Sequence, residues 1–164
     1  DFQIPDRTQC LQCHNSSVGF ARSVRTQQLN RVVGSLNQLD QWNRAKMFEG
    51  DIGPAKKYDA YSAIDDIAKP LLSRVKAYFD VNCSHCHNPS PEAPCYFTGI
   101  DFRYETFKLD SLISGGLIVP KERLNSEIFK RMDSTRPFYR MPYIGSIMKD
   151  DSALAVMGQW IDGL

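Results

Sequence analysis

Four of the five cysteines in this 164-residue chain belong to two copies of one short pattern. The first copy reads Cys-Leu-Gln-Cys-His at residues 10–14, and the second reads Cys-Ser-His-Cys-His at residues 83–87. Two thiols three positions apart lie on one helical turn, so both can react with the same flat molecule, and the histidine that follows can ligate its metal. This spacing is typical of haem c, whose two vinyl groups form thioethers with the two cysteines.

The pattern predicts a role for each of its chemically active side chains. The predicted thioether cysteines and proximal iron ligands are Cys10, Cys13 and His14 in the first motif, and Cys83, Cys86 and His87 in the second. The second ring nitrogen of a proximal histidine is free to donate to a backbone carbonyl, which holds the ring in place. The sequence therefore predicts two covalently bound haem c groups.

Other uses of C-x-x-C fit this chain less well. A thioredoxin-like redox pair needs a surrounding βαβ unit, and the sequence has no such pattern. A structural zinc site needs four tetrahedral ligands, which two cysteine pairs could supply, but here each pair also carries the extra histidine. The fifth cysteine, Cys95, is expected to be a free or buried thiol, or to pair between subunits.

Composition excludes several classes of protein. Hydrophobic residues make up 42% of the chain and charged residues 24%, which is typical of a globular protein rather than a disordered one. No apolar run approaches the roughly 20 residues of a membrane-spanning helix. Twenty Lys and Arg against nineteen Asp and Glu leave a net charge of +1, so overall charge does not favour nucleic-acid binding.

Amphipathic patterns predict two principal helices. Residues 69–82 have Pro70 suited to a first turn and apolar residues at helical spacing, and they lead directly into the second motif. Residues 150–163 begin with acidic residues and end at a glycine, as helices commonly do. Weaker patterns predict shorter helices at 124–132 and around 36–48.

The first motif has no room for an entry helix of its own. Only nine residues precede it, and Pro5 is among them. We therefore expect an N-terminal haem-binding segment at residues 1–60, a linker at 61–68 and a helical domain at 69–164. A segment of about sixty residues cannot easily build an independent core, so it should pack on the helical domain and bring the haems close together.

Residues 69–164 resemble a class I cytochrome c domain. The residues that carry the resemblance are Phe79 four positions before a motif cysteine, the Trp160-Ile161 pair, and the Met141-Pro142 loop. The resemblance implies a mainly α fold in which the first and last helices cross. Val75 departs from it, because many members have a glycine there.

The resemblance also implies a distal ligand for the second haem. In such domains a Met-Pro loop brings sulfur to the iron, which indicates Met141 opposite His87. Pro142 favours this assignment, because it fixes the backbone and prevents helix continuation. Met132 is the alternative, and both could instead be packing residues.

The whole chain is also similar to a group of mostly uncharacterised bacterial dihaem c-type cytochromes. Besides the two motifs, the similar segments are residues 26–31, 37–39, 118–120, 131–132 and 140–142. This resemblance is specific for the cofactor but assigns no partner.

The distal ligand of the first iron stays open. His85 is the only histidine without a role, and it lies between the attachment cysteines of the other haem. It is either the distal ligand of the first haem or a solvent-facing spacer. Met47 offers a further sulfur.

These features favour one-electron transfer between redox partner proteins, alone or as a subunit of a larger complex. The alternative is a dihaem peroxidase-like or other small-molecule oxidoreductase with an open or displaceable site at the first haem. Its only obvious polar candidates near the first motif are Arg22, Arg25 and Gln27. A third alternative is a haem-bearing structural subunit, which would expose a large apolar patch.

Two further expectations concern the haem carboxylates and the location. Residues of the types that hold propionates are Arg103, Arg131, Arg140, Tyr96, Tyr104 and Tyr143. The sequence starts at Asp1 without the basic and apolar regions of a leader, so we expect a mature, processed form. Because the resemblance implies haem attachment outside the bacterial cytoplasm, we expect a periplasmic or extracellular protein.

Overall fold

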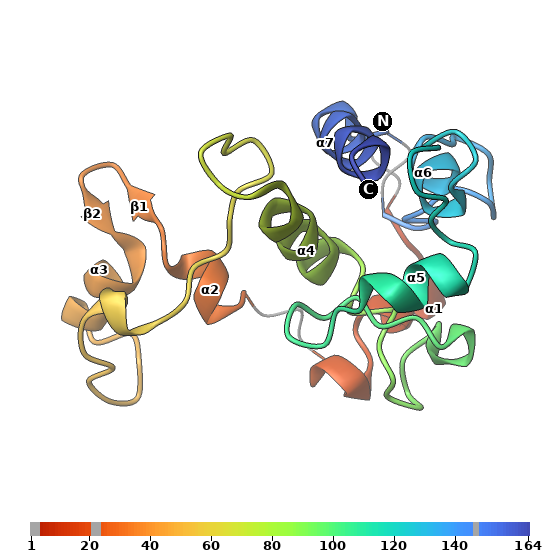
Figure 1. The fold of residues 1–164 in the computed structure, drawn as a ribbon. Helices are drawn as coiled ribbons and strands as arrows, with labels where there is room; N and C mark the ends of the chain where they lie inside the picture. The colour runs from red at the N-terminus through yellow and green to blue at the C-terminus, as the bar shows by residue number, and fades with distance from the viewer. Residues whose placement is uncertain (1–3, 21–23, 146–147) are drawn as a thin grey trace. The chain divides into compact units, whose positions relative to one another are not determined.

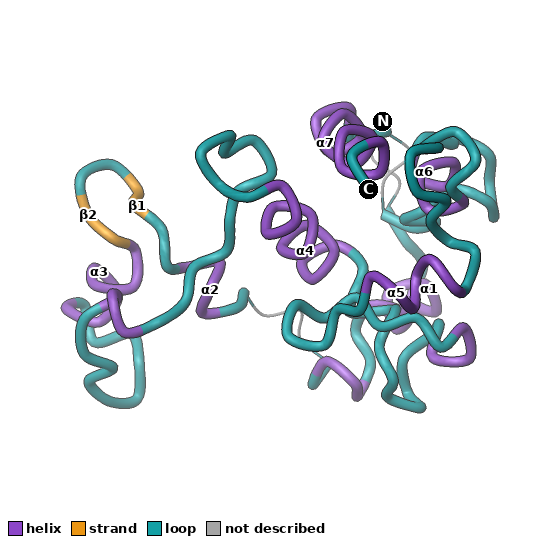
Figure 2. The backbone as a smooth tube through the Cα atoms, in the orientation of Figure 1, coloured by secondary structure: helices purple, strands orange, loops and turns teal. Residues whose placement is uncertain are grey.

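The structure, a computed structural model, describes residues 4–20, 24–145 and 148–164. The described chain is mainly helical, with seven α-helices and one two-stranded sheet, which confirms the predicted fold class (Figure 2). It divides into two compact units: Asp1–Arg22 with Ala63–Leu164, and Ser23–Ser62. No described helix combines the length and the hydropathy that crossing a membrane requires.

Helices α4 (Leu71–Asn82) and α7 (Asp151–Asp162) form the centre of the larger unit (Figure 1). Both were predicted, with bounds that differ by one or two residues. Pro70 stands at the N-cap rather than inside the first turn of α4. The Asp150 carboxylate accepts a hydrogen bond from the Ala153 backbone N–H at 2.9 Å, which caps α7.

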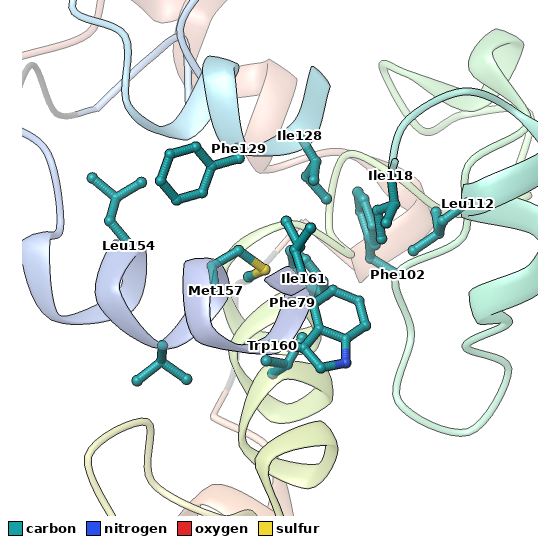
Figure 3. Packing of buried hydrophobic residues seen from close by; sticks show 12 residues of the cluster. Phe79, Phe102, Leu112, Ile118, Ile128, Phe129, Leu154, Met157, Trp160 and Ile161 are labelled. Carbon is teal, nitrogen blue, oxygen red and sulfur yellow. The ribbon is translucent and has the colours of Figure 1, made fainter. Parts of the chain in front are cut away.

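An aromatic and aliphatic core fills the space between these helices. The Phe79 ring of α4 stacks on Phe102 at a centroid distance of 4.6 Å and meets Trp160 edge-on at 6.3 Å. Figure 3 shows Met157 and Ile161 of α7 in the same cluster, and Val75 is fully buried within it. Burying such side chains contributes about 1.5–3 kcal/mol each.

Two short helices complete this core. Helix α6 (Glu127–Met132) begins three residues later than predicted, because Ser126 is its N-cap and belongs to the preceding turn. The Ser126 hydroxyl accepts from the Val119 N–H at 2.9 Å and is completely buried. Helix α5 (Leu109–Ser114) was not predicted. It ends at Gly115, and Gly116 adopts a φ of +73°, which favours glycine.

The first motif forms a helix of its own. Helix α1 (Arg7–Cys13) starts with a capping box: the Asp6 carboxylate accepts from the Gln9 N–H at 2.8 Å, and the Gln9 side chain accepts from the Asp6 N–H at 3.0 Å. A 3-10 turn, η1 (Ser16–Val18), follows. None of the residues of α1 is buried. This helix therefore depends on its caps and on contacts at its C-terminal end.

The smaller unit has its own small core. Its elements are α2 (Thr26–Leu29), β1 (Val32–Val33), antiparallel β2 (Leu36–Asn37), α3 (Gln38–Arg44) and η2 (Ala55–Lys57). The buried residues are Leu29, Leu39 and Ala55. Helix α3 is shorter than the predicted helix around 36–48, because Lys46 takes a positive φ of 55° and ends it.

The predicted boundaries and the compact units divide the chain at different positions. The segment predicted at 1–60 is split, since its motif-bearing part groups with Ala63–Leu164 and the remainder forms Ser23–Ser62. Both C-x-x-C-H motifs consequently belong to the larger unit. A 3-10 turn of that unit, η3 (Tyr96–Thr98), follows the second motif.

Candidate haem-attachment site

The first motif presents its histidine in the orientation expected of a proximal ligand. Cys10 and Cys13 lie on one turn of α1, and the His14 backbone N–H donates to the Cys10 carbonyl at 2.9 Å. The His14 Nδ1 lies 3.0 Å from the Phe20 carbonyl oxygen. A protonated Nδ1 that donates to this carbonyl leaves Nε2 as the ligand atom. The residues of this motif therefore fit a covalently attached haem.

The turn after α1 positions the Phe20 carbonyl that faces His14. Phe20 has a φ of 62°, a region that bulky side chains rarely adopt. Its N–H donates to the Asn15 carbonyl at 2.8 Å, and the Asn15 side chain accepts from the Ser17 N–H at 2.9 Å. Such a backbone conformation costs about 1–3 kcal/mol and is commonly found at functional sites.

The second motif is held by the core of the larger unit. It follows α4 without a break, since the Cys83 N–H donates to the Phe79 carbonyl at 2.8 Å. Cys86 is buried, and the Phe102 N–H donates to the His87 carbonyl at 3.1 Å. The His87 ring packs against Phe102 at 5.4 Å and 73°.

The histidine of the second motif differs from that of the first. The Nδ1 of His87 is buried and has no hydrogen-bond partner among the described residues, so the predicted bond to a backbone carbonyl is not seen here. Burial, and then the charges of His85 and Arg131, lower the pKa of His87 to about 4. The ring is therefore neutral at neutral pH, which is the form that binds a metal.

The two motifs contact each other inside the larger unit. The Sγ atoms of Cys13 and Cys86 and a ring nitrogen of His85 lie within 4.8 Å of one another. The Cys86 Sγ is 3.9 Å from the Gln12 carbonyl oxygen, and the Tyr143 hydroxyl donates to the Gln12 side-chain oxygen. The pKa of Cys86 is raised, chiefly by its hydrogen bond with Cys13 and by burial.

This cluster is not the four-cysteine zinc site that was the alternative. It brings together one cysteine of each motif and one histidine, whereas the first cysteine of each motif, Cys10 and Cys83, does not belong to it. A tetrahedral zinc site needs four ligands, and this group of described residues has three.

The methionines occupy distinct environments. Met141 is half-buried, and its N–H donates to the Arg131 carbonyl at 2.9 Å. This bond attaches the Met141 loop to α6, and the charge of Arg131 is one of the causes that lower the pKa of His87. Met132 packs against the core, while Met47 belongs to the smaller unit and is 63% exposed.

Residues 83–142 match the family described as Planctomycete cytochrome C. The match starts at the first cysteine of the second motif and ends at Pro142, directly after Met141. It supports a cytochrome c-type domain with covalently bound haem c and a role in electron transfer. No curated protein and no solved structure matches the chain.

Most polar side chains of the cytochrome c-type domain that could bind a haem carboxylate have partners within the protein. Arg103 pairs with Asp101 at 2.8 Å, and Arg131 pairs with Glu127 at 2.8 Å. Lys76 lies 4.4 Å above the Tyr104 ring, and Tyr96 is exposed. Arg140 differs, because it is buried and its Nε has no partner among the described residues.

Three features of this site were missed from the sequence. They are the Phe20 carbonyl that faces His14, the packing of Phe102 on His87, and the link from Gln12 to Tyr143. The third joins residues 131 positions apart, and no local pattern indicates such a pair. Of the distal candidates of the enzyme alternative, Arg25 and Gln27 belong to the smaller unit, and Arg22 lies outside the described residues.

Proposed function

We propose that this protein is a dihaem c-type cytochrome that relays single electrons between redox partner proteins, alone or as a subunit of a larger complex. Each motif would attach one haem through its two cysteines and supply its histidine as proximal ligand. The contact between Cys13 and Cys86 is the observation that carries the proposal. Electron transfer falls steeply with distance, so haems attached to cysteines whose Sγ atoms lie within 4.8 Å of each other would exchange electrons rapidly.

In this proposal residues 69–164 form a class I cytochrome c-like domain with Met141 as the distal ligand of its haem. The family match, which runs from Cys83 to Pro142, supports the assignment. So does the bond of the Met141 N–H to Arg131, which fixes the loop beside α6. A thioether ligand raises the reduction potential, which suits an electron carrier more than an oxygen-binding site.

His85 is our candidate for the distal ligand of the first haem. Its Nδ1 is buried without a hydrogen-bond partner in the described chain, and a ring nitrogen lies within 4.8 Å of the Cys13 Sγ. A buried polar atom without a partner is costly, and ligation of iron by this nitrogen would supply the missing partner. The alternative is that His85 only separates the cysteines of the second motif.

Covalent attachment and export are part of the same proposal. Thioether bonds keep the haem in a small protein during repeated oxidation and reduction. Attachment of this kind takes place outside the bacterial cytoplasm, so the proposal places the protein in the periplasm or outside the cell.

Low-temperature EPR of the oxidised protein tests the ligand assignment. We expect two low-spin signals, one of His/Met type and one of His/His type, and loss of the second signal in His85→Ala with the first unchanged. A stable high-spin signal in the unmodified protein would contradict the relay and favour the peroxidase-like alternative. A His85→Ala spectrum identical to that of the unmodified protein would show that His85 is a spacer.

A further inference from the structure

Arg140 is a buried cation whose guanidinium is not fully paired by the described residues. The residue is 8% exposed, its Nη2 donates to the Tyr143 carbonyl at 3.3 Å, and its Nε is buried without a partner among the described residues. A guanidinium keeps its charge at every physiological pH, so burial cannot neutralise it. Such a charge is retained where an anion or several hydrogen bonds compensate it.

The comparison with other arginines of this unit shows that Arg140 is unusual. Arg74 is similarly buried, but its guanidinium binds the Ile64 carbonyl, with the Nε at 2.8 Å. Arg103 and Arg131 each have a carboxylate at 2.8 Å. Among the described residues, Arg140 has neither a carboxylate nor a carbonyl at its Nε.

The surroundings of Arg140 connect it to both motifs. Tyr143, whose carbonyl accepts its Nη2 bond, donates its own hydroxyl to Gln12 of the first motif. The pKa of Tyr143 is raised by burial and then by the thiols of Cys86, Cys95 and Cys13, so Tyr143 lies close to the cysteines of both motifs. Arg140 is therefore linked through Tyr143 to the junction where the motifs meet.

We propose that the Arg140 guanidinium binds a carboxylate at this junction. The inference rests on the proposed function, because a propionate of one of the two haems would supply this carboxylate. A free carboxylate or other small anion from solution is the second source with the same chemistry. The planar guanidinium suits a carboxylate, because Nε and one Nη can donate to its two oxygens in parallel.

The charge of Arg140 would then raise the reduction potential of the haem that it faces. A cation beside a propionate offsets the negative charge that otherwise stabilises the oxidised iron. Removal of the guanidinium should shift the equilibrium toward the oxidised state by about tenfold, which corresponds to about 59 mV for a one-electron couple.

Potentiometric titration of the haem-loaded protein tests this, after two haems per chain have been counted. We expect Arg140→Gln to lower the potential of one haem, Arg140→Lys to restore most of it, and the matched control Arg136→Gln to leave both unchanged. Arg136 is exposed and stacks on Tyr139 at 5.4 Å in the same loop. Unchanged potentials in Arg140→Gln would overturn the inference, whereas a chain without two haems would overturn the proposed function first.

Titration of the unmodified protein in increasing acetate separates the two sources. Potentials that do not respond to acetate identify the carboxylate as a propionate. Potentials that respond to acetate, with the response lost in Arg140→Gln, identify a free anion.

A readout on the unmodified protein covers the case in which Arg140→Gln does not assemble. In ¹⁵N NMR spectra of the haem-loaded protein, the Arg140 Nε–H should exchange slowly with solvent, and Arg140→Lys assigns the signal by its disappearance. Exchange as fast as that of the exposed Arg136 would contradict carboxylate binding.

Discussion

The two C-x-x-C-H motifs are held by very different surroundings. The first lies on α1, a helix that has no buried residue and is fixed by the capping box of Asp6. The second continues from α4, with Cys86 buried and His87 packed on Phe102. The same five-residue pattern thus occurs once on a surface helix and once within a core.

This difference shows that the pattern determines the local backbone geometry of a motif but not the stability of the structure around it. In both motifs the histidine N–H donates to the carbonyl of the first cysteine at 2.9 Å. What differs is the number of core contacts around that turn. We therefore expect the second motif to unfold only when the whole larger unit unfolds. The first motif should be attached to that unit through its haem and through Gln12.

The largest expected effect comes from removing the attachment cysteines of one motif at a time. Cys83→Ser with Cys86→Ser should remove one haem and strongly lower the melting temperature, because this motif is part of the core. Cys10→Ser with Cys13→Ser should also remove one haem, but its melting temperature should be much higher than that of the first double variant. Haem content and thermal unfolding by circular dichroism measure both, and equal melting temperatures would contradict the comparison.

A single core substitution should show the same asymmetry. Phe79→Ala removes the ring that stacks on Phe102 and meets Trp160, so it should lower the free energy of unfolding by about 3–5 kcal/mol. Leu11→Ala on α1, where the side chain is 54% exposed, should change it by less than about 0.5 kcal/mol. Denaturant titration measures both, and a comparable loss for Leu11→Ala would mean that α1 belongs to the folding core.

The two N-cap aspartates provide a matched pair. Asp150→Ala removes the cap of α7 and should lower the free energy of global unfolding by about 0.5–2 kcal/mol. Asp6→Ala removes the equivalent cap of α1, and its effect should be confined to α1 because that helix buries nothing. Denaturant titration should detect the first change only, while hydrogen exchange in residues 7–14 should detect the second.

The smallest effect is expected at the link between the motifs. Tyr143→Phe removes the hydroxyl that donates to Gln12 and so loses about 0.5–1.5 kcal/mol of local stabilisation. Hydrogen exchange of residues 7–14 should accelerate by about two- to tenfold, with no change in residues 71–82. Unchanged exchange at α1 would show that the Gln12–Tyr143 bond does not hold the first motif.

Much of the fold could be predicted, because local patterns determine it. The apolar spacing in 69–82 and 150–163 predicted α4 and α7, and the fold class is confirmed. Helix α5 was missed, because six residues carry little periodicity. Helix α6 begins late because Ser126 bonds to Val119, a contact that depends on the tertiary fold.

The candidate site, like the fold, could be predicted only in part. The motif residues could be named from spacing, and the Phe20 carbonyl at His14 fits the predicted type of support. The contact of Cys13 with Cys86, and the burial of Arg140, could not be predicted, because they arise from chain segments far apart in sequence. The environment of His85 is likewise known only from the structure.

The number of haems per chain tests the central claim most directly. The pyridine haemochrome spectrum of the purified protein, divided by the protein concentration from amino-acid analysis, gives this number. The account predicts two covalently bound haems per chain, falling to one when the cysteines of either motif are replaced by serine. A single haem in the unmodified protein, lost on replacement of Cys83 and Cys86 but kept on replacement of Cys10 and Cys13, would contradict it.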